Sequence, residues 1–241
     1  MRIPAIRRLF DGVGPNPWVV RLAFALKDVD IAAFTRKIRL DDQGRAENRS
    51  DPELRTLNPA RTTPFMQLED GAVLAESVAM VRYIDALYPQ GPALTGDPGC
   101  AVSRAKVDMW SLRIAHQIVT PFQRQFQYGE GMPYFKQHVP WAEASAPAVP
   151  GLRAQVEEQL RWLEVHGCVG GAFLAGGADL SVADLQLWTT GVFMGKINSA
   201  KLTPPFDPFG AGGLVDAELP RLRAWSDRVA ERVAALGTAG K

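Results

Sequence analysis

The stretch from Asn58 to Tyr88 constrains the fold most, because several local signals follow one another in it. Thr63-Pro64 precedes a short apolar run, Phe65 to Leu68, and a proline is tolerated at the start of a strand although it cannot donate to the ladder. Asp70-Gly71 is typical of a two-residue hairpin turn. The apolar pair Val73-Leu74 follows the turn, so the sequence predicts a β-hairpin here.

A helix is expected directly after this hairpin, opening at Glu76-Ser77. Its apolar residues recur at spacings of three and four, at Met80, Val81, Ile84, Leu87 and Tyr88. An acid and a hydroxyl at a helix start suit the exposed backbone N–H groups there. The same N–H groups and the helix dipole favour a bound carboxylate. Glu76-Ser77 is therefore either an ordinary capping pair or part of a ligand site.

The order Asn-Pro-x-x-x-x-Pro, Asp-Gly, Leu-x-Glu-Ser and Tyr-Ile resembles the glutathione-binding half of a cytosolic glutathione S-transferase. Within that family, the chain resembles bacterial members whose active-site loop reads Pro-Asn-Pro. In that family the proline, here Pro64, is cis, and the residue before it, here Thr63, offers its backbone to the cysteine part of glutathione. The resemblance also implies that Glu76 and Ser77 hold the γ-glutamyl group, with glutathione as co-substrate.

The expected elements follow the thioredoxin-like order. They are strands over Ala5–Phe10 and Ile31–Leu40, a helix over Trp18–Leu26 with Pro17 in its first turn, and a short helix over Pro52–Leu57. The resemblance implies an α/β thioredoxin-like domain followed by an all-α helical bundle, the glutathione transferase fold. We predict the glutathione-binding domain over residues 1–88, a Pro- and Gly-rich linker over 89–100, and the helical domain over 101–241.

The composition excludes some classes of binding partner. The 241 residues are 46% hydrophobic, and 27 Lys and Arg nearly balance 26 Asp and Glu, which argues against nucleic acid or an anionic membrane as a partner. No apolar run has the length of a membrane span, and the N-terminus lacks the apolar core of a signal peptide. Two cysteines form no disulfide framework, and the three histidines show no metal-ligand spacing. We expect a cytoplasmic protein without a bound metal.

The first loop departs from the family pattern. Family members activate the glutathione thiol, whose pKa of ~8.5 leaves it mostly protonated at neutral pH, with a donor aimed at the sulfur. Many bacterial members carry a serine or cysteine where this chain has Gly14, which has no side chain. Asn16, two residues later, can donate through its amide and is the predicted catalytic residue. Alternatively, Asn16 only caps the following helix.

Other candidate residues are less specific. Arg39, at the end of the second predicted strand, could reach the glycine carboxylate of glutathione, although a solvated surface position is the alternative. The pocket for a hydrophobic second substrate is predicted from Val13 together with Trp110, Arg113 and His116. His116 also lies on an apolar stripe, which favours a buried core histidine. The stripe comprises Val102, Ala105, Met109, Leu112, His116 and Val119.

The helical half carries one more motif. Ser181 with Asp184 three residues on is a capping-box variant that opens a buried helix, and the family has a similar box there as a folding element.

Two functions stay open. The first is a glutathione S-transferase whose bound thiolate attacks a hydrophobic electrophile, by conjugation or by displacement such as aryl-ether cleavage or dehalogenation. The second is a catalytically weak binding or assembly subunit of the same fold. The family resemblance, with the apolar content around Phe65-Met66 and the helix from Val102, predicts a dimer with an identical or a related chain.

Overall fold

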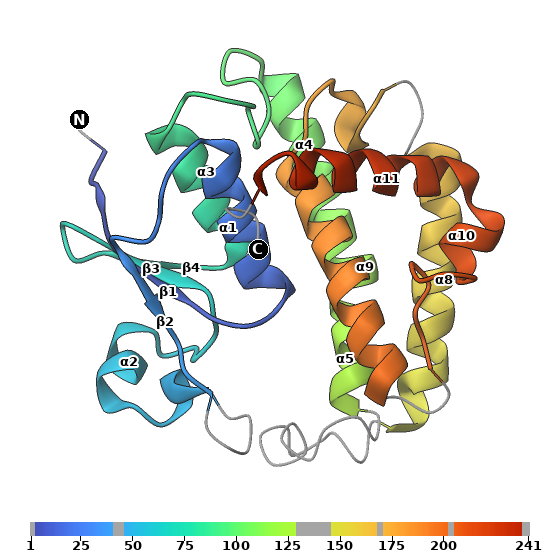
Figure 1. Cartoon of the computed structure of the whole chain (residues 1–241), viewed down its shortest axis with the longest axis horizontal. Helices are drawn as coiled ribbons and strands as arrows, with labels where there is room; N and C mark the ends of the chain where they lie inside the picture. Colours follow the sequence, from blue (N-terminus) through green and yellow to red (C-terminus); the bar gives the residue numbers. More distant parts are fainter. Residues whose placement is uncertain (1–2, 41–45, 129–145, 168–170, 202–204, 238–241) are drawn as a thin grey trace. The chain divides into compact units, whose positions relative to one another are not determined.

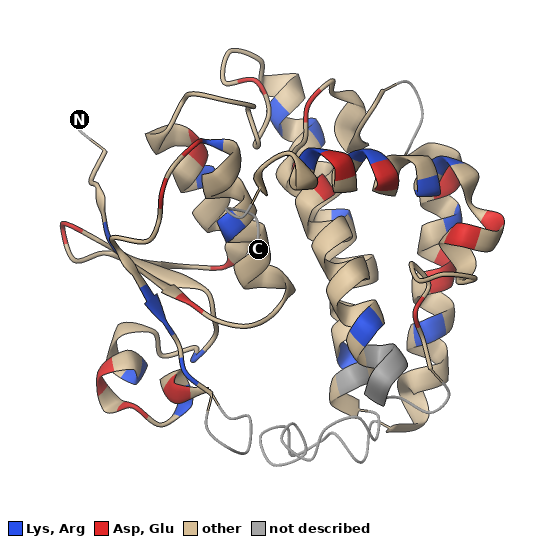
Figure 2. Ribbon diagram, viewed as in Figure 1, with Lys and Arg blue, Asp and Glu red and all other residues tan. Residues whose placement is uncertain are grey.

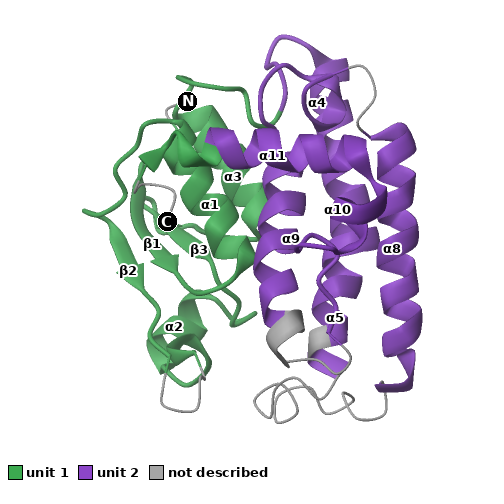
Figure 3. Cartoon of the chain, turned by 45° about the vertical axis from the view of Figure 1, so that its right-hand side comes forward, with its two compact units in different colours: residues 1–95, 233–241 green, residues 96–232 purple. Residues whose placement is uncertain are grey.

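The computed structural model describes residues 3–40, 46–128, 146–167, 171–201 and 205–237. The chain divides into two compact units, residues 1–95 with 233–241 and residues 96–232 (Figure 3). The predicted fold class, a thioredoxin-like domain followed by a helical domain, is confirmed. Charges of both signs occur in both units, and basic and acidic residues both lie along α11 (Pro220–Ala234) (Figure 2).

In unit 1, the described residues form a four-stranded sheet in the order β2-β1-β3-β4, with β1 and β2 parallel and the other pairs antiparallel (Figure 1). The elements are β1 (Ile6–Asp11), α1 (Pro15–Leu26), β2 (Thr35–Lys37), the 3-10 turn η1 (Glu47–Arg49), α2 (Pro52–Leu57), β3 (Phe65–Leu68), β4 (Val73–Ala75) and α3 (Ser77–Leu87). The predicted hairpin and the helix after Glu76 are confirmed. The turn is longer than the predicted two residues, because the N–H of Leu68 donates to the oxygen of Ala72 at 2.8 Å and so closes a three-residue loop, Glu69–Gly71.

The core of unit 1 lies on both faces of this sheet. Phe10 and Phe65, paired across β1 and β3, stack with their ring centroids 4.3 Å apart, and Leu54 of α2 packs on the same cluster. Because side chains alternate along a strand, Leu9 and Met66 point to the other face. Both are fully buried, and α3 packs on α1 and contacts β3 and β4.

The second predicted strand is too long. Only Thr35–Lys37 pairs with β1, whereas residues 32–34 form a turn. β2 is an edge strand and pairs only with the last three residues of β1, Leu9–Asp11.

Residues after α3 are tied to unit 1. The buried Lys27 pairs with Asp85 at 2.6 Å, and its ammonium group also donates to the carbonyl oxygen of Pro92 at 2.7 Å. The carboxylate of Asp85 accepts from the backbone N–H of Thr95 at 2.9 Å. These bonds hold the first part of the predicted linker against the thioredoxin-like unit.

Unit 2 is helical. Its elements are α4 (Ala101–Ile114), the π-helical turn η2 (Ala115–Val119), α5 (Thr120–Tyr128), η3 (Ala146–Ala148), α8 (Val149–His166), η4 (Leu174–Gly176), α9 (Val182–Lys201), α10 (Leu214–Glu218) and α11 (Pro220–Ala234) (Figure 1). The helix passes Pro121 without ending, because the wider turn before it re-registers the backbone bonds: the N–H of Thr120 donates to the oxygen of Ala115. Of the described helices, none is long and apolar enough to span a membrane.

Candidate active site

The strand register brings the predicted glutathione-binding segments to one edge of the sheet. Phe10 pairs with Phe65, and Phe65 pairs with Ala75. The residues just beyond these pairs, Gly12, Thr63-Pro64 and Glu76, therefore lie at the same edge. Three segments far apart in the sequence meet there.

The Thr63-Pro64 bond is cis, as the family resemblance predicts. Two buried asparagines hold the backbone that leads to it. The side-chain amide of Asn48 donates to the carbonyl oxygen of Arg61 at 2.8 Å, and that of Asn58 donates to the oxygen of Thr62 at 2.9 Å. Thr63 is thus presented by a backbone that is fixed on its N-terminal side.

The first loop passes directly against Thr63. A Cβ atom added at Gly12 would lie 2.6 Å from the hydroxyl oxygen of Thr63. Any side chain at position 12 would push these two segments apart, so the glycine permits their close approach. The sequence pattern did not single out Gly12, because the contact depends on the pairing of β1 with β3.

A buried carboxylate anchors the same loop. Asp11 is only 1% exposed, and it accepts from Nη1 of Arg21 at 2.9 and 3.1 Å and pairs with Lys37. Arg21 also donates to the carbonyl oxygen of Gly12 at 3.3 Å. The two ends of the loop before α1 are therefore joined by an ion pair. Sequence reasoning missed Asp11, since its partners come from α1 and β2.

Helix α1 begins at Pro15, with Gly14 at its N-cap at φ 142°, a positive φ that favours glycine, and without a side-chain cap. Asn16 is the second residue of the helix. The alternative that Asn16 caps this helix is wrong, because the capping position is taken by Gly14. Its amide is left for other contacts, and Asn16 as a sulfur donor stays a prediction.

At the start of α3, Glu76 is exposed at the N-cap with φ 68°, and Ser77 is buried as the first helical residue. Neither side chain makes a capping hydrogen bond to the helix. The reading of this pair as an ordinary cap is therefore wrong. A left-handed backbone at a residue other than glycine is uncommon and concentrates at functional sites.

Arg39 is 83% exposed and contacts Glu47, with its Nη2 3.3 Å from the carboxylate. Arg36 holds the same carboxylate at 2.7 Å. Hydrogen bonds from Arg39 and Arg36 lower the pKa of Glu47 from 4.5 to about 2 despite the opposing effect of burial. Arg39 thus has an intramolecular partner, which the sequence did not reveal.

The residues predicted to line the second-substrate pocket come from both units. Val13, on the first loop, is 67% exposed. In unit 2, Trp110 and Arg113 both contact Trp162 of α8: the two indole rings are 5.7 Å apart, and the guanidinium lies 3.5 Å from the ring centroid. These two side chains take part in helix packing.

His116 is exposed rather than a buried core histidine, which corrects that expectation. The inward face of α4 is formed by Val107, Trp110, Ser111 and Ile114 instead of the predicted stripe. Within the described ranges, no three side chains of His, Cys, Asp or Glu gather as metal ligands would.

Comparison with known proteins identifies the family of the chain. The family model for the glutathione S-transferase N-terminal domain matches residues 13–87, and the one for the C-terminal domain matches residues 146–228. Among curated proteins, a probable maleylacetoacetate isomerase of Caenorhabditis elegans is 34% identical over 101 residues, which are 42% of each chain. Glutathione S-transferase 2 of Saccharomyces cerevisiae is 30% identical over 115 residues, 48% of this chain and 46% of the yeast protein. The matches thus span less than half the length of these relatives.

Solved structures show the same fold. A glutathione S-transferase domain-containing protein of Marinobacter aquaeolei superimposes with a TM-score of 0.73 at 24% identity, over 93% of this chain and 98% of that one. Gtt2 of Saccharomyces cerevisiae gives 0.69 at 22% identity, over 95% and 99%. The two family models together cover more than half of the sequence, and the chain belongs to the glutathione S-transferase family.

Proposed function

We propose that the protein is a glutathione-dependent enzyme whose bound thiolate attacks a hydrophobic electrophile. The observation that carries the proposal is the start of α3. Glu76 takes a left-handed conformation there, neither Glu76 nor Ser77 caps the helix, and the strand register places both beside the cis Thr63-Pro64 bond.

The residues at this edge fit the parts of glutathione. The exposed carboxylate of Glu76 matches the ammonium of the γ-glutamyl group, and the Ser77 hydroxyl with the first N–H groups of α3 matches its carboxylate. The backbone of Thr63 is free of the sheet at the cis bond and suits the cysteine part. Arg39 would reach the glycine carboxylate by giving up its contact with Glu47.

Glutathione supplies the thiol, and the protein has to favour its ionised form. Asn16 donates to the sulfur through its side chain, and the N-terminal end of α1 adds positive potential. Asp11 and Arg21 hold the loop before α1 in place and so fix the direction of Asn16. Val13, exposed on that loop, offers an apolar contact for the electrophile. Trp110, Arg113 and His116 stay predicted lining residues.

Two reaction types fit a positioned thiolate. In the first, the sulfur stays on the product, by conjugation or by displacement of a halide or aryl ether. In the second, the thiolate adds to a conjugated double bond, the bond rotates, and the thiolate leaves again, so glutathione is not consumed. Relatives named maleylacetoacetate isomerase in Caenorhabditis elegans, Pseudomonas aeruginosa and Drosophila melanogaster suggest the second type, for which the substrate would be a dicarboxylate rather than a hydrophobic electrophile.

Binding is tested by calorimetry with glutathione on Glu76→Gln and Ser77→Ala. Each lost charge-assisted hydrogen bond is worth ~1.5–3 kcal/mol, so we expect affinity to fall about tenfold or more. Glu69→Gln, an exposed acid at the other end of the same hairpin, is the matched control and should bind normally. Unchanged affinity in both site variants would remove this site assignment.

Turnover is tested with an aryl halide and with maleylacetoacetate. A conjugate with loss of free thiol supports the transferase, and isomerisation at constant thiol supports the isomerase. Binding with no turnover of either substrate would favour the binding or assembly subunit. We also propose a cytoplasmic location and a dimer of identical or related chains.

A further inference from the structure

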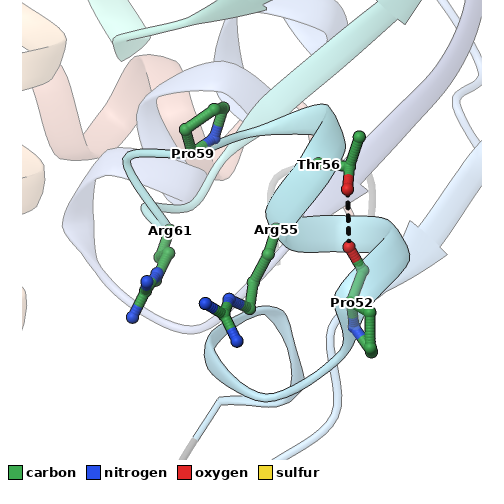
Figure 4. Close-up of a pocket in the computed structure, with 5 residues that line it drawn as sticks. All are labelled: Pro52, Arg55, Thr56, Pro59 and Arg61. Atoms are coloured by element: carbon green, nitrogen blue, oxygen red, sulfur yellow. Dashed lines mark hydrogen bonds between the residues drawn. The ribbon is translucent and has the colours of Figure 1, made fainter.

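Helix α2 and the loop that follows it line a pocket of about 400 Å³ in unit 1. Its lining residues are Pro52, Arg55, Thr56, Pro59 and Arg61. Figure 4 shows the side chains of Arg55 and Arg61 extending in the same direction from these two neighbouring segments. The hydroxyl of Thr56 donates to the carbonyl oxygen of Pro52 at 2.9 Å, so that proton is already used.

Neither guanidinium has a partner within the described part of the chain. Two acids that precede α2 in the sequence are engaged elsewhere, and Glu53 of α2 is exposed. Glu47 accepts from Arg36 and Arg39, and Asp51 caps α2 by accepting from the N–H groups of Glu53 and Leu54. The pocket therefore carries two positive charges that the lining does not neutralise.

The backbone at Arg61 is fixed in an unfavourable conformation. Its φ is 56°, in the left-handed region that a residue with a Cβ rarely adopts and that glycine adopts without strain. The N–H of Arg61 donates to Asn58 at 2.9 Å, and its carbonyl oxygen accepts from the buried Asn48 at 2.8 Å. The direction in which this arginine leaves the chain is thus set before any ligand arrives, and the side chain is present at a position where glycine would be less strained.

We propose that this pocket binds the phosphate group of a small molecule whose apolar part rests on Pro52 and Pro59. Guanidinium groups match phosphate oxygens with paired N–H donors, and two of them suit its double charge. None of the five lining residues belongs to the set assigned to glutathione. The argument for this pocket therefore does not depend on the proposed function.

The test is calorimetry at low ionic strength with phenyl phosphate, inorganic phosphate and succinate as probes. We expect phenyl phosphate to bind at least tenfold more tightly than inorganic phosphate, because only the former reaches the proline walls. Arg55→Gln and Arg61→Gly should each weaken phenyl phosphate at least tenfold. Arg8→Gln removes an exposed positive charge from β1 and serves as the control, with binding unchanged.

Arg61→Gly also separates binding from folding, since glycine relieves the left-handed strain. Its melting temperature should not fall while binding is lost; should it melt early, Arg55→Gln alone decides. Saturating glutathione should leave the phenyl phosphate affinity unchanged. The proposal is overturned if no probe binds saturably, if succinate binds as tightly as phenyl phosphate, if glutathione displaces the probe, or if the arginine variants bind normally.

Discussion

Two prolines at the start of α1 decide which groups can reach a bound sulfur. Pro15 and Pro17 have no backbone N–H, and the N–H of Trp18 donates to the oxygen of Gly14 at 3.2 Å. Of residues 15–18, all of them described, Asn16 is left with both an N–H outside the helix ladder and a side-chain amide. The alternative that backbone groups activate the thiol therefore depends on the N–H groups of Gly14 and Asn16.

Asn16→Ala should raise the pKa of the bound glutathione thiol, because the side-chain donor to the thiolate is lost. One pKa unit corresponds to ~1.4 kcal/mol, so about a tenfold loss of rate at neutral pH that recovers at higher pH is expected. Thiolate absorbance of the glutathione complex, titrated against pH, measures this shift.

Asn16→Asp separates catalysis from helix stability in the same experiment. Aspartate cannot donate and repels a thiolate, so the rate should fall further than in Asn16→Ala. An acid in the first turn of a helix is stabilising, so the free energy of unfolding should not decrease. Titration curves that superimpose for wild type and both variants would exclude Asn16 from thiol activation.

The pKa of Glu47 can show whether Arg39 contacts glutathione. Its pKa of about 2 is held down chiefly by the hydrogen bond from Arg39. If Arg39 turns to the glycine carboxylate of glutathione, that bond is lost and the pKa of Glu47 should rise toward 4.5, as it should in Arg39→Gln without ligand. An NMR titration of the Glu47 carboxyl group with and without glutathione measures this pKa. An identical pKa in both conditions would remove Arg39 from the glutathione-binding residues.

Among the elements, α9 is fixed by one buried carboxylate. Asp184 accepts from the N–H and hydroxyl of Ser181 at 2.8 and 2.6 Å, confirming the predicted capping-box pair. It also accepts from the N–H of Leu174 and the indole of Trp225, each at 2.8 Å. The capping pattern predicts the local bonds, whereas the bonds to Leu174 and Trp225 depend on how η4 and α11 pack.

Asp184→Asn should lower the free energy of unfolding by about 3 kcal/mol, because an amide leaves buried donors unsatisfied. Asp179→Asn, an exposed acid just before α9, is the control. Burial raises the pKa of Asp184 above 3.8, so the folded state holds this proton more tightly than the unfolded state. The contribution of Asp184 is then greatest in acid and decreases as pH rises through the raised pKa. Urea unfolding at several pH values would contradict this if the gap between wild type and Asp184→Asn widened toward neutrality.

The hairpin and α3 could be predicted because each depends on residues next to one another: a proline, Asp-Gly and an apolar spacing. The contact of Gly12 with Thr63 and the ion pairs of Asp11 and Glu47 could not, because they depend on strand register and on residues from other elements. The sequence therefore predicts the segments of the site better than the bonds that hold them.

At the scale of the whole molecule, α4 carries two apolar faces. The predicted stripe is the outer one: Val102, Met109 and Leu112 are 64%, 55% and 60% exposed. Periodicity shows that such a face exists but cannot tell which of two faces packs inward. Phe65 and Met66, the other basis for the predicted dimer, are fully buried and cannot contact a partner.

An exposed apolar stripe at heptad-like spacing is typical of a contact with another helix, and its exposure to water is unfavourable in a monomer. We expect Met109→Asp and Leu112→Asp to convert a dimer into monomers, because each places a charge in the apolar contact. Light scattering at micromolar concentration measures the mass, and Arg104→Asp, an exposed position on another side of α4, should leave it unchanged. A wild-type monomer would contradict the dimer, and a dimer that survives both substitutions would place its interface on another surface of the chain.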